Sequence, residues 1–280
     1  MVAAMSASER GLAPQAADSE PAARSATFAL ELSDLTVRVP GRTLIDRLTV
    51  RLPAGRVTVV LGRNGAGKSS LLHAIAGLNP RASGEVRVHG RALTGWTRRE
   101  LARWLALLPQ ASDDPFPGTA LDSVLVGRHP HIDFWRWEDS TDREIARRAL
   151  AATDLAGFEA RDVVTLSGGE RRRLACAAVL AQDPGAFLLD EPVQQLDPHH
   201  QVETLRLFRT LADSGRLVVM SLHDVGLAAR FADDAILLYG NGRWQHGAAG
   251  DVLNASTLSE LYGTPLQELR WPEGRTFVPA

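Results

Sequence analysis

The sequence predicts an α/β fold with a mostly parallel β-sheet core, an antiparallel β subdomain and an inserted α-helical subdomain. Residues 57–61 form a continuous β-branched run, typical of a strand buried on both faces, and a glycine-rich loop follows directly. Two further apolar runs, residues 186–189 and 217–221, alternate with amphipathic helical stretches. Parallel strands joined by crossover helices explain this alternation.

The antiparallel subdomain is predicted from the region that precedes this core. Two apolar runs, residues 35–39 and 48–52, flank the turn-forming pair Pro40-Gly41. Residues 1–26 are rich in Ala, Ser, Pro and Glu and have no apolar periodicity. We therefore expect a flexible tail there.

The inserted helical subdomain is predicted at about residues 111–165, where the pattern changes. Helical segments replace buried strands, with candidates at residues 121–126 and 141–153. Aromatic and proline-rich turns separate them. The insert thus interrupts the α/β core.

The C-terminal region carries two local signals. The pair Asn241-Gly242 is typical of a hairpin turn, and residues 256–262 are typical of a short capped helix. We expect one folded domain over residues 27–263 and a C-terminal tail over residues 264–280.

Composition is that of an ordinary globular protein. Of the 280 residues, 45% are hydrophobic and 23% are charged, and the formal net charge is -2. No overall positive charge is available to neutralise a phosphate backbone, so nucleic acid is not an expected partner. The basic run Arg171-Arg172-Arg173 lies on a predicted helix, where we expect a solvated or phosphate-adjacent face.

Cysteine content and apolar run lengths suit a reducing cytosol. Cys176 is the only cysteine, so no internal disulfide can form, and its apolar neighbours predict a small buried side chain. No segment approaches the roughly 18 apolar residues of a membrane span, and the first 26 residues lack the apolar centre of a secretory signal. We do not expect the chain to enter the membrane itself.

The loop after residues 57–61 matches the eight-position phosphate-binding pattern and leads into a predicted helix. Backbone N–H groups in such a loop bind phosphate oxygens, Lys68 adds positive charge, and the Ser69 hydroxyl can ligate Mg²⁺. A glycine turn with an incidental lysine is the alternative, and the flanking strand and helix disfavour it. The residues predicted to bind ATP are Gly62, Arg63, Asn64, Gly65, Ala66, Gly67, Lys68, Ser69 and Ser70.

Asp190 and Glu191 end the apolar run of residues 186–189, at the carboxyl end of a central strand. Open α/β sheets bind ligands at that edge. We expect Asp190 to hold Mg²⁺ and Glu191 to orient or deprotonate the attacking water. An acidic loop without a chemical role is the alternative, and the nearby phosphate loop weighs against it.

A second phosphate-facing surface is predicted where Ser167, Gly168 and Gly169 open a helix. Free N–H groups and the positive end of the helix dipole favour an anion there. A glycine-rich helix cap without a ligand is the alternative.

In this order, the motifs resemble those of ATP-binding cassette ATPases, the motor subunits of ABC transporters, over about residues 28–263. The resemblance implies a P-loop NTPase core of RecA-like topology. It identifies Gln110 as the Q-loop glutamine, residues 166–170 as the signature motif, Asp197 as part of the D-loop and His223 as the switch histidine.

The positions of these residues agree with the roles that the resemblance implies. His223 follows an apolar run at a strand's carboxyl end, from which its imidazole can reach a terminal phosphate. Gln110 lies at the junction with the insert, where it can sense Mg²⁺. The family's subunits associate head to tail, so Ser167 and its neighbours would cap ATP held by the other subunit. Val39 is aliphatic where the family usually carries an adenine-stacking aromatic residue.

The resemblance implies the ATPase subunit of a bacterial importer. It would act as a homodimer beneath a separate integral membrane permease, on the cytoplasmic face of the inner membrane, and serve a periplasmic or lipoprotein substrate-binding protein indirectly. Residues 126–131, 196–201 and 222–230 resemble importers of iron–siderophore, haem or cobalamin.

Two functions other than transport are possible for a chain with a phosphate loop, and the sequence disfavours both. ABC-type ATPases of DNA repair or translation usually carry a long coiled-coil insert, zinc modules or two cassettes, and the sequence shows none of these. A phosphate-loop kinase does not explain the signature turn.

Two further clusters of side chains could form a metal site or a contact surface. His129, His131 and the pair at 199–200 lack the ligand spacing of a four-ligand metal site, so we do not expect one. Trp135 and Trp137 form either a contact patch for a partner or part of the packing of the insert.

Overall fold

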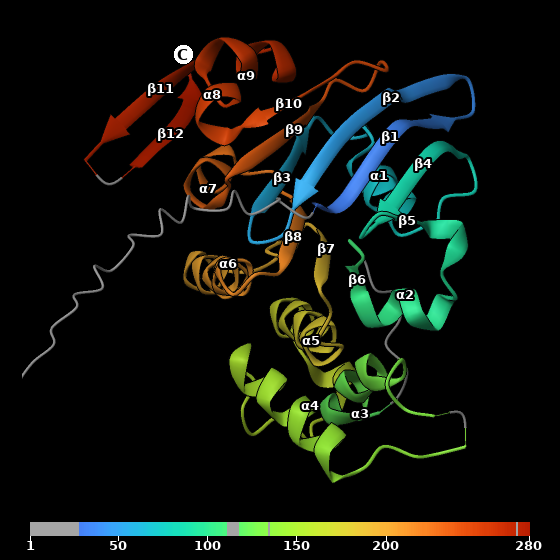
Figure 1. The fold of residues 1–280 in the computed structure, drawn as a ribbon. Coiled ribbons are helices and arrows are strands. Elements are labelled where there is room, and N and C mark those ends of the chain that lie inside the picture. The colour runs from blue at the N-terminus through green and yellow to red at the C-terminus, as the bar shows by residue number, and fades with distance from the viewer. Residues whose placement is uncertain (1–27, 111–117, 134, 273) are drawn as a thin grey trace, which may run out of the picture.

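A mostly parallel sheet forms the centre of the computed structural model, which describes residues 28–110, 118–133, 135–272 and 274–280 (Figure 1). Its strand order is β10-β9-β3-β8-β7-β6, and only the β9–β10 pairing is antiparallel. Its strands are β3 (Val57–Gly62), β6 (Leu105–Leu108), β7 (Ala186–Asp190), β8 (Leu217–Ser221), β9 (Asp234–Leu238) and β10 (Trp244–Ala248).

Every residue of β3, β7 and β8 is buried, as the apolar runs predict. Successive side chains of a strand point to opposite faces, so Val59 and Val60 pack into two separate cores. The α/β fold class is thereby confirmed. The predicted hairpin turn at Asn241-Gly242 joins β9 to β10.

An antiparallel sheet of order β2-β1-β4-β5 packs over one face of this core. Its strands are β1 (Phe28–Val39), β2 (Arg42–Pro53), β4 (Ala82–Val88) and β5 (Arg91–Ala92). Val39 pairs with Arg42 beside the predicted Pro40-Gly41 turn. The β1–β2 pair is the one that the sequence predicts, whereas β4 and β5 were not predicted.

Helices cover both faces of the parallel sheet. The first core contains α1 (Lys68–Ile75) and α2 (Arg98–Trp104), together with the antiparallel sheet. The second core contains five further helices, which are α5 (Gly168–Ala181), α6 (Pro198–Asp213), α7 (Val225–Phe231), α8 (Ala249–Val252) and α9 (Ala255–Tyr262).

The helical subdomain lies beyond the β6 edge of the sheet (Figure 1). Its helices α3 (Ala120–Leu125) and α4 (Ser140–Ala152) form a third core with one side of α5. These helices agree with both predicted segments to within one residue, while the expected start of the insert at residue 111 lies outside the described residues. Three 3₁₀ turns complete the described helices: η1 (Leu93–Gly95), η2 (Val126–Arg128) and η3 (Val163–Thr165).

The chain after Gly263 differs from its prediction. Residues 264–280 were expected as a C-terminal tail, but β11 (Leu266–Trp271) and β12 (Gly274–Pro279) form an antiparallel hairpin. Phe277 is buried in the second core, against which the hairpin packs. The mostly exposed β11 gives the sequence little apolar pattern to reveal this strand. The predicted tail at residues 1–26 lies outside the described residues.

In the described part of the chain, no helix combines the length and apolar character needed to cross a membrane.

Candidate active site

The glycine-rich loop connects β3 to α1 and packs closely against its own backbone and that of β9. A Cβ at Gly62 would lie 2.5 Å from the carbonyl oxygen of Leu238. Gly67 caps α1 with φ 108°, a conformation that strongly favours glycine. The N–H of Ala66 donates to the carbonyl of Arg63 over 3.0 Å, which closes the turn.

Lys68 is buried and folds back over this loop, where its Nζ donates to the carbonyl of Gly62 over 3.1 Å. Burial lowers the pKa of Lys68, while the carboxylates of Glu191 and Asp190 oppose that shift. An anionic phosphate beside the ammonium group would stabilise its charged form. The loop is therefore suited to bind a phosphate chain.

Asp190, at the end of β7, is held by a neighbouring strand. Ser221 at the end of β8 donates its hydroxyl to Asp190 Oδ1 over 2.6 Å, and its Oγ accepts from the N–H of Glu191 over 2.9 Å. The other carboxylate oxygen, Oδ2, is buried and has no hydrogen-bond partner among the described residues. An oxygen in this state fits the ligand preference of Mg²⁺.

Glu191 contacts two of the other predicted residues. Its carboxylate accepts a hydrogen bond from Gln110 Nε2 over 3.0 Å and contacts His223 Nε2. Glu191 is buried, and its φ of 52° lies in the left-handed region that non-glycine residues rarely adopt. Strained, buried carboxylates of this kind concentrate at functional sites.

Lys68, Gln110 and Glu191 line a cavity of about 420 Å³. Within the loop, Gly62, Arg63 and Ala66 shape its backbone, while its other residues face the cavity. The lining residues include Val39, Arg42, Leu44, Asn64, Gly65, Gly67, Lys68, Ser69, Ser70, Gln110 and Glu191. The structure thus brings the phosphate loop, the Q-loop glutamine and the acidic strand end into one site.

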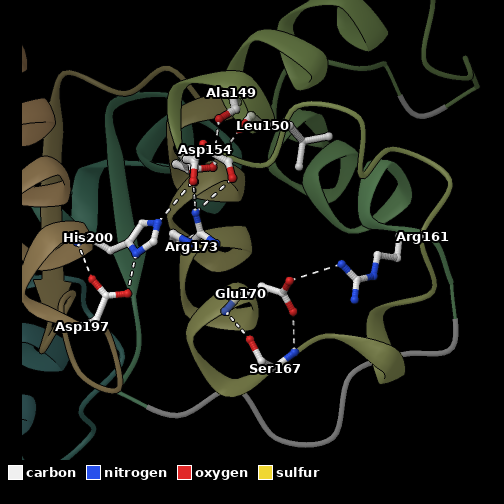
Figure 2. A network of polar contacts seen from close by, with 10 residues as sticks. Ala149, Leu150, Asp154, Arg161, Ser167, Glu170, Arg173, Asp197 and His200 are labelled. Carbon is white, nitrogen blue, oxygen red and sulfur yellow. Dashed lines mark hydrogen bonds and ion pairs between the residues drawn. The ribbon is translucent and has the colours of Figure 1, made fainter.

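The signature turn lies beside a second cavity, of about 340 Å³, which Gly168 lines together with Gln110. Ser167 caps α5: its hydroxyl accepts from the N–H of Glu170 over 3.2 Å, and its own N–H donates to the Glu170 carboxylate over 2.7 Å (Figure 2). A Cβ at Gly168 would lie 2.8 Å from Gln195 Oε1, and one at Gly169 would lie 3.2 Å from the Gln195 carbonyl. Both glycines therefore permit a close approach of the loop that contains Gln195.

Asp197 belongs to a network that joins α6 to the helical subdomain (Figure 2). Its carboxylate caps α6 at the N–H of His200 over 3.0 Å and bonds to the His200 ring over 2.7 Å. The other ring nitrogen lies 3.2 Å from the carboxylate of Asp154, which also accepts from Arg173 over 2.7 Å. One histidine thus bridges two carboxylates from different parts of the fold.

The basic run does not form the solvated face that is one of its two predicted roles, although Arg171 and Arg172 line the cavity beside Gly168. Arg172 is buried and donates to backbone carbonyls, and Arg173 is paired with Asp154. Arg171 donates to the carbonyl of Leu166 over 2.7 Å. Successive helical residues point about 100° apart, so α5 directs these side chains toward different neighbours.

The other candidate clusters lie apart from this site. His131 Nε2 is hydrogen-bonded to the carbonyl of Gln182 over 2.8 Å. Trp135 and Trp137 are 91% and 88% exposed, so the interpretation that they pack within the insert is wrong. A contact patch remains the other interpretation of these two side chains.

Fold and site together define a phosphate-loop ATPase: a glycine-rich loop and lysine for the phosphates, and a buried glutamate positioned beside them. Residues 45–194 match the family model for ABC transporters. The chain is 42% identical over 240 residues to a hemin import ATP-binding protein of Streptomyces coelicolor, covering 85% of this chain and 84% of that one. It is 36% identical over 251 residues to a petrobactin import ATP-binding protein of Bacillus anthracis, covering 85% and 92%.

Solved structures agree with these relatives. An ABC transporter in an inward-facing conformation superposes with a TM-score of 0.78 at 28% identity, over 90% of this chain and 98% of that one. This chain therefore belongs to the ABC transporter family and is an ATP-hydrolysing member of it.

Replacing the carboxylate at the centre of the site tests its role. We expect Glu191→Gln to retain ATP binding and to slow hydrolysis by about 10²- to 10⁴-fold, because the amide cannot accept a proton from water. Steady-state phosphate release and binding of a fluorescent ATP analogue measure the two effects. Hydrolysis at the wild-type rate would contradict this role.

The contacts of His200 predict a pH-dependent stability. Hydrogen bonds to Asp197 and Asp154 raise the pKa of His200 above its usual value. The contribution of His200 to the free energy of unfolding is therefore fully present below about pH 6.5. It is lost as the pH rises through the pKa that His200 has in the folded protein. The pKa of Asp197 falls to about 2, so the contribution of this carboxylate to stability changes with pH only in acid.

We expect wild type to lose more stability than His200→Gln between about pH 6 and about pH 8.5. Urea unfolding midpoints at both pH values give the comparison, and other titrating groups cancel between the two proteins. An identical pH dependence would show that the His200 contacts do not stabilise the fold.

Val39 offers the nucleobase apolar contact but no aromatic face. We expect Val39→Tyr to tighten ATP binding by about fivefold, since base stacking contributes roughly 1–3 kcal/mol in single-stranded nucleic-acid sites. Val39→Leu is the control, because it adds apolar volume without a ring. Titration with a fluorescent analogue measures both, and equal affinities for the two variants would place the base elsewhere.

Proposed function

We propose that this chain powers a bacterial ABC importer for iron–siderophore, haem or cobalamin cargo. Support comes from the relatives, which include a cobalamin import ATP-binding protein of Halobacterium salinarum at 39% identity over 83% of this chain. The chain spans 58% of that protein. Repair or translation ATPases are not favoured by any of these relatives.

The observation that carries the catalytic part of the proposal is the convergence of Gln110 and His223 on buried Glu191. Lys68 and the loop N–H groups would hold the phosphate chain of ATP. Glu191 would accept the proton of the attacking water, and His223 would act beside the terminal phosphate. Gln110 would orient the water or the nucleotide from the opposite side.

Mg²⁺ is the metal that this site would hold. Ser69 would supply a hydroxyl, Gln110 an amide oxygen and Asp190 its buried carboxylate oxygen Oδ2. The ion would neutralise charge that develops on the phosphates. Hard oxygen donors of this kind fit Mg²⁺ better than a softer transition metal.

A homodimer would complete each ATP site. Gly168 lines a cavity other than the one at the phosphate loop, which supports a role for Ser167, Gly168 and Gly169 toward a second subunit. Head-to-tail association would put this turn and Asp197 against the partner's nucleotide. The two-fold symmetry of such a pair makes both sites equivalent.

The transport partner would be an integral membrane permease, with the chain peripheral on the cytoplasmic face of the inner membrane. Gln110 lies between β6 and the helical subdomain, so permease movement at the subdomain could reach Glu191 through it. A periplasmic or lipoprotein substrate-binding protein would act through the permease. No direct contact with cargo is required of this chain.

Transport is tested by reconstituting the chain with the permease that co-purifies with it. Vesicles loaded with ATP would be offered haem, an iron–siderophore and cobalamin in separate uptake assays, with Glu191→Gln as the matched inactive control. ATP-dependent uptake of one cargo supports the proposal. Hydrolysis stimulated by DNA or ribosomes, with no permease recovered, would overturn it.

Mixing two inactive subunits tests the composite sites. Ser167→Arg blocks the signature turn, and Lys68→Ala disables the phosphate loop. A mixed dimer would regain one site with both parts intact, so we expect partial recovery of hydrolysis, up to about half the wild-type rate. Differently tagged subunits establish that mixed dimers form, and their complete inactivity would count against action across the interface.

A further inference from the structure

A buried arginine connects the segment that carries Gln110 with the segment that carries Glu191. Arg172 on α5 is 7% exposed, although arginine is rarely buried without specific partners. We propose that Arg172 is a positioning residue for ATP hydrolysis, which fixes Gln110 relative to Glu191 by binding their backbones. The proposal rests on the catalytic role of Glu191 given above.

The guanidinium group binds carbonyls of two separate segments. Nη1 donates to Pro109 over 2.8 Å and to Gln110 over 3.2 Å. Nη2 donates to Glu191 over 2.8 Å and also to Asp190. One rigid, planar group therefore spans the exits of both strands, and each of its terminal nitrogens serves one segment.

Arg172 acts where the sheet itself no longer holds these segments together. The β6–β7 ladder ends with the pair Leu108 and Leu189. Beyond that pair, the chains carrying Gln110 and Glu191 leave the ladder. Four arginine-to-carbonyl hydrogen bonds replace the missing ladder bonds and set the relative position of the two backbones.

Burial removes the guanidinium group from water, so this group depends on hydrogen bonds with the protein. Burial lowers the pKa of Arg172, and nearby Cys176, Asp190 and Glu191 oppose that shift. Its Nε is also buried without a hydrogen-bond partner among the described residues. Because leaving further donors unpaired is costly, the four carbonyl bonds are held firmly.

The helix extends this positioning to the signature turn. Arg172 lies five residues after Ser167, about 7.5 Å along the helix axis at 1.5 Å per residue. Movement of α5 relative to the sheet would therefore pull on the backbones of Gln110 and Glu191. A shift of the signature turn would thus change the position of Glu191 in the same subunit.

The test compares Arg172→Met and Arg172→Lys with wild type in the full-length dimer. Both variants lose the forked donor, and Lys keeps the charge. We expect kcat to fall about 10- to 100-fold, since a displacement of about 1 Å can cost that much, while ATP affinity stays within about threefold. If Arg172→Met does not fold, Arg172→Lys carries the test.

The matched control is Arg128→Met. Arg128 is also buried, binds the carbonyl of Ala181 over 2.9 Å and pairs with Asp142, away from the ATP cavity. Its removal reports what the loss of a buried arginine does to hydrolysis through stability alone. Thermal unfolding is measured for every variant, and we expect Arg128→Met to keep kcat within about twofold of wild type.

A double variant separates positioning from simple damage. If Arg172 acts through Glu191, then Arg172→Met added to Glu191→Gln should lower kcat by less than about threefold, because the two effects are not additive. A full further loss, an unchanged kcat in the single variants, or an equal loss in Arg128→Met overturns the positioning role. Normal hydrolysis by Glu191→Gln would instead overturn the catalytic scheme, and the positioning role with it.

Discussion

Parallel hydrogen bonding from β9 through β3, β8 and β7 to β6 brings the carboxyl ends of these strands to one edge of the sheet. Three of these strands then lead to different parts of the site: β3 to the phosphate loop, β7 to the two carboxylates, and β8 to His223. Because β3, β7 and β8 are buried throughout, a shift of register would expose apolar side chains and is strongly opposed. The chemistry depends on this alignment.

The helix α5 is the second shared component, because it belongs to two cores at once. Leu174 and Ala177 pack with the helical subdomain, whereas Cys176 and Val179 pack against the sheet. Gly168 in its first turn lines a different cavity from the one at the phosphate loop, and Arg172 reaches the ends of β6 and β7. One rigid element thus connects subdomain position, signature turn and hydrolysis.

Separating energy supply from cargo recognition explains why relatives named for hemin, petrobactin and cobalamin import resemble this chain. The residues gathered here would contact phosphates, metal and backbone, and none of them needs to read a cargo molecule. A single site geometry can therefore serve permeases of different specificity. The cargo would then be decided by the partners with which this chain assembles.

Local patterns in the sequence were sufficient for the α/β fold, the phosphate loop and the helix that follows this loop, because each depends on residues adjacent in the chain. Other features needed the tertiary structure. Gln110 and Glu191 meet across 81 positions, and the burial of Arg172 depends on carbonyls about 20 to 60 residues away. The hairpin after Gly263 forms because Phe277 finds a core elsewhere in the fold. Sequence periodicity reports which side a residue faces, whereas only packing determines what it meets there.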